Sequence, residues 1–228
     1  MQLGDQAYRQ VLAKSTLSKN KEWDEILQRV GKRISEAAHK SNFAWEFKLI
    51  DSPEKNAFCL PGGKVAVYTG IMPILKNEAG MAAVIGHEVA HATLRHGGQR
   101  LTANLGTQLG VLVLGQILSG KDSSNRQLVL AALGLGAQVG VILPFSRSNE
   151  SEADEIGLRY MARAGYDPHQ APLLWERFGV SEKGGPPAFL STHPSSESRK
   201  TELEKQIPSV MSTYEKSAKY GAGTEFKF

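Results

Sequence analysis

The chain has 228 residues, of which 41% are hydrophobic and 22% are charged, so its length and composition suffice for one substantial buried core. The net charge of +4 is modest and spread along the chain, which favours an ordinary solvated surface and predicts no nucleic-acid partner. The single cysteine, Cys59, excludes an internal disulfide and leaves the cellular compartment open.

The first predicted elements are a helical segment and a strand. Apolar residues recur every three or four positions within Leu3–Lys40, which predicts one or two amphipathic helices that cover the core. The start, Met1–Asp5, has neither the basic flank nor the apolar core of a signal peptide, as expected of a mature or truncated chain. Large apolar residues alternate with smaller or polar ones across Phe43–Asp51, which predicts a strand.

The middle of the chain predicts a β-hairpin followed by a capped helix. The segment Asn56–Gly70 is typical of two short strands joined by a Pro-Gly-Gly turn. A helix is predicted from Asn77, whose side chain can cap it, to Gly97–Gly98. Two apolar, Gly-rich stretches follow, at Leu105–Leu118 and Leu128–Phe145. Polar residues interrupt both, so we expect buried helices, with contact to a membrane surface as the alternative.

The C-terminal part is predicted to be helical and then irregular. Helices are expected over Ser148–Gly165 and Gln170–Gly179, and the Gly- and Pro-rich segment Ser181–Pro187 is expected to be a loop. The last residues, Tyr214–Phe228, lack clear periodicity and are expected to be peripheral. Because helices outnumber strands, the predicted fold class is α+β, mostly helical with a small β-sheet or hairpin.

The run His87-Glu88-Val89-Ala90-His91 lies within the predicted helix and carries the clearest chemical signal. Residues four apart on a helix project from the same face, so His87 and His91 can present two imidazole nitrogens to one ion. Glu88 is rotated by about 100° from His87, and from there its carboxylate can reach a water molecule beside the metal instead of the metal itself. Zinc accepts nitrogen and oxygen ligands in a tetrahedron. The sequence therefore predicts one zinc ion per chain.

A catalytic zinc site needs a third protein ligand and an open fourth position, and an acidic cluster on the later predicted helix can supply the ligand. Glu150 and Asp154 share a helix face with small and apolar residues. Glu152 points about 200° away from Glu150 and is expected to pair with Arg159 or solvent. We therefore predict Glu150 as the ligand and Asp154 as a neighbour that accepts the outer ring proton of a ligand histidine. Glu155 is expected to be a surface charge.

These motifs resemble metallopeptidase family 48, gluzincins that include prenyl-protein endopeptidases, HtpX, and the OMA-type and BepA-type quality-control proteases. The resemblance rests on the His-Glu-any-any-His run, on the segment Ser146–Asp154 and on the Asn56–Gly70 hairpin, and it covers most of the chain, about Asn56–Arg199. It implies a zincin-like metallopeptidase with the small sheet or hairpin beside the active-site helix.

The resemblance also implies a set of site residues. Members of the family bind zinc through the two histidines and the first Glu of a Glu-any-any-Ala-Asp motif, which maps onto His87, His91 and Glu150. The Asp of that motif is treated as catalytic in the family and maps onto Asp154. The implied ligands agree with the argument from helix faces.

Similarity to the BepA-like and OMA-like branch extends to Ser191–Arg199. A histidine lies near the metal in that branch, so the resemblance implies two roles for His193. It occupies the open position at rest, or it helps to stabilise the oxyanion in catalysis. Arg199 would position this loop or bind the substrate carbonyl.

The other histidines have plainer interpretations. His96 follows His91 by five residues, which turns it off the ligand face, and we expect it to cap the helix end, where the dipole favours a cation. His39 and His169 lie in polar surroundings without a partner pattern. None of the three is predicted to belong to the site.

The residues and the resemblance together predict a zinc metalloendopeptidase that hydrolyses peptide bonds of unfolded or misassembled proteins. Glu88 would take a proton from the attacking water and pass it to the leaving amine. An exposed hairpin edge near Val65–Thr69 would pair with an extended substrate and give broad specificity. Two other functions stay open, a non-catalytic zinc-binding scaffold, which would not need Glu88, and a metal-dependent hydrolase of other substrates.

The expected domain organisation is a single metallopeptidase domain over 1–228. It divides into an N-terminal helical cover at 1–40, a catalytic core at 41–200 and a peripheral C-terminal segment at 201–228. The chain lacks the clear spanning helices of the membrane-integral branches, which argues against a prenylated substrate. The resemblance implies polypeptide substrates, membrane-surface or outer-membrane assembly partners, and a place in the bacterial periplasm or cell envelope.

Overall fold

The computed structural model describes residues 2–97, 99, 145–180, 187–193, 197–221 and 225–227. Its strands are β1 (Glu46–Ile50), β2 (Ala57–Leu60) and β3 (Lys64–Tyr68). Its helices are α1 (Gln2–Ala13), α2 (Lys21–Ala37), α3 (Met72–Leu75), α4 (Glu78–Thr93), α7 (Arg147–Arg163), α8 (Gln170–Val180), α9 (Ala188–Thr192) and α10 (Glu197–Lys216), with a 3-10 turn η1 (Thr69–Ile71) before α3. These elements confirm a mostly helical α+β fold with a small sheet.

The three strands form one sheet in the order β1-β3-β2. β2 and β3 make the predicted antiparallel hairpin, and its turn contains Gly62 and Gly63, both at positive φ. β1 pairs with β3 in parallel, from Glu46 opposite Lys64 to Ile50 opposite Tyr68. The prediction of a free edge near Val65–Thr69 is therefore wrong, because β3 is the central strand. Among the strands of the described residues, β2 lies at an edge of the sheet, since β1 occupies the other side of β3.

Helices cover both faces of this sheet because successive side chains of a strand point to opposite faces. Tyr8 of α1 packs with Ile50 and Ala66 on one face. Val65 and Val67 point to the other face and belong to the main core, which includes apolar residues of α2 and α4. The N-terminal helices thus hold the sheet from two sides, and α4 lies against β2.

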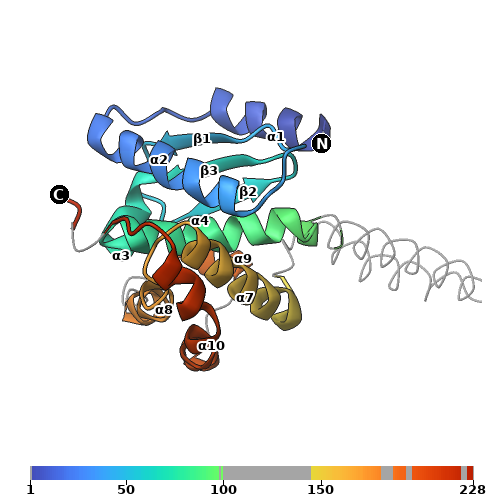
Figure 1. Ribbon diagram of the computed structural model, residues 1–228. Helices are drawn as coiled ribbons and strands as arrows, with labels where there is room; N and C mark the ends of the chain where they lie inside the picture. The colour runs from blue at the N-terminus through green and yellow to red at the C-terminus, as the bar shows by residue number, and fades with distance from the viewer. Residues whose placement is uncertain are drawn as a thin grey trace, which may run out of the picture.

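The central element of the fold is α4, which lies between the sheet and the helices α7, α8 and α10 (Figure 1). Asn77 begins it, as predicted, since the Asn77 side chain accepts a hydrogen bond of 2.8 Å from the Gly80 backbone N–H. Residues Glu78–Ala92 are all buried, which explains why this helix is rich in small and apolar residues. At Gly86 it meets Gly157 of α7 so closely that a Cβ on Gly157 would lie 2.9 Å from the His87 backbone nitrogen. This glycine contact lets α7 bring its acidic residues up to α4.

The C-terminal helix packs into the core more deeply than predicted. Leu203, Ile207 and Val210 of α10 are buried, and α10 lies against α7 and α8. Phe226 is buried as well. The expectation of a peripheral segment at 201–228 is wrong for these residues, because Leu203, Ile207 and Val210 recur at the i, i+4 and i+7 spacing of a helix face that packs inward.

Two predictions concern residues that the structure does not describe. The apolar stretches Leu105–Leu118 and Leu128–Phe145 lie outside the described residues, apart from Phe145, and so does the Ser181–Pro187 loop, apart from Pro187. Across the part of the chain that is described, no helix combines the length and the apolar character needed to cross a membrane.

Candidate metal centre and active site

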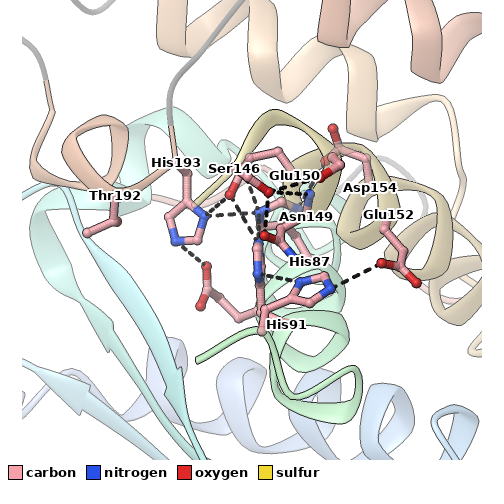
Figure 2. Close-up of polar contacts among 12 residues, drawn as sticks. His87, His91, Ser146, Asn149, Glu150, Glu152, Asp154, Thr192 and His193 are labelled. Carbon is pink, nitrogen blue, oxygen red and sulfur yellow. Dashed lines mark hydrogen bonds and ion pairs between the residues drawn. The ribbon is translucent and has the colours of Figure 1, made fainter. Parts of the chain in front are cut away.

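Four side chains from three parts of the chain point toward one another in the interior (Figure 2). His87 and His91 come from α4, Glu150 from α7, and His193 directly follows α9. Each offers one potential ligand atom, these atoms all lie within 4.8 Å of one another, and all four residues are buried. The structure therefore brings together the three ligands predicted from the sequence and places His193 with them.

The spacing of the four donor atoms fits a single zinc ion. His87 Nε2 lies 3.0 Å from His91 Nε2 and 3.2 Å from His193 Nδ1. Glu150 Oε1 lies 3.0 Å from His193 Nδ1 and 3.3 Å from His91 Nε2. Zinc–nitrogen bonds of about 2.0–2.1 Å give a tetrahedron with edges of about 3.3–3.4 Å, close to these distances. Three imidazoles and one carboxylate are also ligands that zinc accepts, so the cluster can bind one such ion.

The electrostatic state of the cluster suits a cation. Burial lowers the pKa of His91 to about 2, although Glu150 opposes the shift, so His91 is neutral and able to bind a metal. Burial would also lower the pKa of His87, but hydrogen bonds with Asp154 and Glu150 raise it to about 9. Burial would raise the pKa of Glu150, but hydrogen bonds from the surrounding histidines hold it well below its usual value. The carboxylate is therefore ionised, and a cation would replace the proton that His87 carries.

Asp154 lies behind His87, on the side of the ring away from the donor cluster. Its Oδ1 is 3.0 Å from His87 Nδ1, which is the contact predicted for a residue that orients a ligand histidine. Arg199 donates two hydrogen bonds to the Asp154 carboxylate, at 2.6 and 2.7 Å, and a third to Glu150. The guanidinium also lies 3.5 Å from the centre of the Trp175 ring. Arg199 is thus a buried support for two carboxylates. Its predicted roles in positioning the loop or binding the substrate carbonyl stay predictions.

Glu88 lies beside the cluster but is not one of its four donors. Its Oε2 accepts a hydrogen bond of 3.1 Å from the backbone N–H of Cys59 in β2, and its Oε1 is 3.2 Å from His193 Nε2. Burial raises the pKa of the Glu88 carboxyl group, which makes the carboxylate a stronger base than an exposed one. The edge strand β2 thus fixes the direction in which this base points.

His193 is held in place through the backbone on both sides of α9. The Phe189 N–H donates to the Lys55 carbonyl at 3.1 Å, and the Thr192 carbonyl accepts a bond of 3.1 Å from the Phe145 N–H. The His193 ring stacks on Phe189 with 4.5 Å between ring centroids. His193 Nδ1 faces the donor cluster and Nε2 faces Glu88. One imidazole therefore fills the fourth donor position and contacts the candidate base.

Comparison with known proteins agrees with this geometry. The family model of Peptidase family M48 matches residues 20–207. The chain belongs to this family. The resemblance inferred from the motifs is thereby confirmed, and the four-donor cluster is a candidate metal site in a chain of this family.

Three relatives illustrate the range of this M48 chain's similarity. The mitochondrial metalloendopeptidase OMA1 of Schizosaccharomyces pombe is 39% identical over 203 residues, covering 85% of this chain and 56% of the relative. OMA1 of Arabidopsis thaliana is 41% identical over 180 residues, covering 77% of this chain and 35% of the relative. The β-barrel assembly-enhancing protease of Escherichia coli is 34% identical over 207 residues, covering 87% and 42%. The chain thus spans from about a third to little more than half of these relatives.

The structure overturns the sequence-based interpretation of His96 in this M48 chain. α4 ends at Thr93, and Arg95 adopts a φ of 62°, which interrupts the helix just before His96. His96 is consequently 1% exposed, with its Nδ1 3.0 Å from His91 Nδ1. The prediction assumed that the helix continued to Gly97, which would have pointed His96 away from His91. The sequence feature that could have indicated this contact is the position of His96, a third histidine only five residues after His91.

Glu152 meets only part of its prediction, since its side chain is 54% exposed to solvent. It lies 3.2 Å from His96 Nε2 instead of pairing with Arg159. Arg159 binds Glu155 at 2.6 Å, one turn away on the exposed face of α7. His39 and His169 are exposed, and His169 contacts only its neighbour Asp167 among the interactions of the described residues. These two histidines lie away from the site, as expected.

Proposed function

We propose that this M48 chain is a zinc-dependent metalloendopeptidase that binds one zinc ion through His87, His91 and Glu150. The observation that carries the proposal is the convergence of these donors with Glu88 buried beside them. A scaffold that only bound zinc would need the donors but not a buried carboxylate directed by the Cys59 N–H. This contact therefore favours hydrolysis over the scaffold alternative.

In the proposed mechanism Glu88 is the general base. A zinc ion in the site would supply Lewis acidity, lowering the pKa of a water molecule and polarising the scissile carbonyl. Glu88 takes a proton from the attacking water and delivers it to the leaving amine. The Cys59 N–H holds one carboxylate oxygen, so the other is directed toward the donor cluster. Asp154 and Arg199 fix the ring of His87 from behind.

His193 is proposed to keep the resting site closed. Its Nδ1 takes the fourth donor position, and its Nε2 lies within hydrogen-bond distance of Glu88. A catalytic zinc needs an open position for water and substrate, so His193 must leave before a peptide can react. The second role considered from the sequence, stabilisation of the oxyanion, would require His193 to remain nearby after it has moved.

The substitution His193→Ala separates these two roles. We expect the rate of hydrolysis of unfolded casein to rise, because without the imidazole the fourth position of the site is open in every molecule. If the open state makes up about one tenth of the population, kcat/KM rises about tenfold. A fall in kcat with zinc still bound would instead assign His193 to the transition state.

The proposed substrates are extended segments of unfolded or misassembled polypeptides. Such a segment could add to the outer edge of β2, which pairs with no strand of the described residues, next to Glu88. Outward groups on this strand are those of Ala57 and Cys59, because the Cys59 N–H points to Glu88 and directions alternate along a strand. The Ala57 N–H is bound by the Asn56 side chain at 2.9 Å. Pairing would therefore begin with the two carbonyl oxygens and recognise backbone instead of sequence.

A role in envelope protein quality control is also proposed, with outer-membrane or membrane-surface assembly partners. It is supported by the similarity to a protein named β-barrel assembly-enhancing protease. Other relatives are named as mitochondrial metalloendopeptidases, so the similarity alone does not select the bacterial periplasm. Fractionation of cells that produce the full-length protein tests the location, and recovery from the cytoplasm alone would refute it.

The experiment that tests the proposed function is hydrolysis of unfolded casein with and without zinc. We expect cleavage by the zinc-loaded protein, loss of cleavage after a chelator removes the metal, and recovery after about one equivalent of zinc is returned. A tightly folded protein of similar size is the matched control and should remain intact. If neither the zinc-loaded protein nor zinc-loaded His193→Ala cleaves casein, the proposal fails.

A further inference from the structure

His96 is a buried histidine beside His91, and it belongs neither to the His-Glu-any-any-His motif nor to the proposed mechanism. His96 is 1% exposed, and both nitrogens of its ring have a partner. Its Nδ1 lies 3.0 Å from His91 Nδ1, and its Nε2 lies 3.2 Å from Glu152 Oε2. Figure 2 shows Glu152 on the opposite side of the donor cluster from His193, and the Glu152 side chain is 54% exposed. His91, His96 and Glu152 thus form a line of contacts that leads from the donor cluster to the surface of α7.

The direction of the hydrogen bonds along this line follows from the proposed zinc site. His91 Nε2 faces the other donors, so a neutral His91 that binds zinc there carries its proton on Nδ1. Two Nδ1 atoms that face each other at 3.0 Å need one donor and one acceptor. His91 is then the donor and His96 the acceptor. The proton of His96 is left on Nε2, where the Glu152 carboxylate accepts it.

We propose that His96, supported by Glu152, is a positioning residue that orients His91 and holds it in the tautomer that binds zinc. The inference rests on the proposed function, because it assigns the tautomer of His91 from zinc binding at Nε2. His87 is held in the corresponding way by Asp154, whose carboxylate is fixed by Arg199. The two ligand histidines therefore have different supports, a buried carboxylate for His87 and a buried imidazole for His91.

The two supports differ in their contact with solvent. The side chain of Asp154 is 7% exposed, whereas that of Glu152 is 54% exposed. Water competes for an exposed carboxylate, so removal of Glu152 should have a smaller effect than removal of His96. The support for His91 thus acts mainly through the buried acceptor atom and only secondarily through the carboxylate.

Zinc affinity measures this role directly, without reference to peptidase activity. The purified protein competes with a chromophoric chelator for Zn²⁺ in wild-type form and with His96→Leu or His96→Asn. Leucine removes the acceptor, and we expect zinc affinity to fall about 10–100-fold, the usual effect of losing such a partner. Asparagine retains a carbonyl oxygen near the position of Nδ1, so His96→Asn should recover a large part of that loss.

A structural effect of burying leucine at this position is measured separately by thermal unfolding of the zinc-free proteins. If zinc-free His96→Leu and His96→Asn are equally stable but differ in zinc affinity, the result supports the role of His96 in positioning His91. If His96→Leu and His96→Asn lose affinity equally, or both bind zinc within about twofold of wild type, the proposal is overturned. Failure of the wild-type protein to bind zinc is a different result, and it would refute the proposed function itself.

Glu152 has a matched control on the same helix. Glu155 carries the same charge at similar exposure, 46% against 54%, but pairs with Arg159. We expect Glu152→Ala to weaken zinc binding severalfold and Glu155→Ala to leave it unchanged. In the His96→Leu background Glu152→Ala should have no further effect, because coupled residues are not additive. Equal shifts for the two glutamates, or full additivity, would show that Glu152 acts only as a surface charge.

Discussion

Replacement of Glu88 by glutamine should abolish most peptidase activity while the protein still binds one zinc ion. Glutamine has nearly the same shape, and its side-chain oxygen can still accept the hydrogen bond that the Cys59 N–H donates to Glu88. It cannot accept a proton from water, so kcat/KM on unfolded casein should fall about 10²–10⁴-fold, the usual contribution of a general base. Zinc content should be unchanged because Glu88 lies outside the four-donor cluster.

The matched control for this change is Glu155→Gln, which removes an exposed carboxylate on α7 far from the chemistry. It should keep full activity. Glu88→Gln with a normal zinc content and more than about a tenth of wild-type activity would exclude Glu88 as the general base. Loss of zinc from the same variant would make Glu88 a ligand instead.

The largest expected effect on stability comes from Arg199. Its guanidinium binds Asp154 through two hydrogen bonds and Glu150 through a third, and all three side chains are buried. Burial would raise the pKa of Asp154, but Arg199 and the hydrogen bond with His87 hold it below its usual value. Arg199→Met leaves this carboxylate buried without its cation, which should lower the free energy of unfolding by about 3–5 kcal/mol. Urea denaturation of the zinc-free proteins measures the loss.

A matched exposed pair serves as the control. Arg159 binds Glu155 at 2.6 Å, and both side chains are about half exposed. Arg159→Met should cost no more than about 1 kcal/mol, as for most surface ion pairs. If Arg199→Met costs as little as Arg159→Met, then the buried network around Asp154 does not stabilise the fold. Arg199→Lys should remain destabilised, because an ammonium group cannot reproduce the two parallel hydrogen bonds.

Local features of the fold were predictable from the sequence because they depend on neighbouring residues. Asn77 caps α4 as expected, and the Gly62-Gly63 turn joins the predicted hairpin. The i to i+4 spacing placed His87 and His91 on one face, and helix periodicity selected Glu150 over Glu152 as their partner. In the structure Glu150 lies within the cluster and Glu152 outside it.

Features that depend on contacts between distant segments were not predictable in this way. The strand order, with β3 in the centre, follows from the parallel pairing of β1 with β3 across a long connection. The Cys59 N–H that holds Glu88 is a backbone group, so no residue type marks it. The prediction for His96 is wrong because Arg95 adopts a positive φ, and this residue is not a glycine, the residue type that usually indicates such a position in a sequence.

We propose that His87, His91 and Glu150, with His193 at rest, hold one zinc ion in a peptidase site. Zinc K-edge X-ray absorption of the stoichiometrically loaded protein tests it most directly. We expect about one zinc per chain with four nitrogen or oxygen neighbours at about 2.0–2.2 Å, and one nitrogen fewer in the His193→Ala protein. An identical nitrogen count in the two proteins, a sulfur neighbour from Cys59, or failure to retain zinc would contradict it.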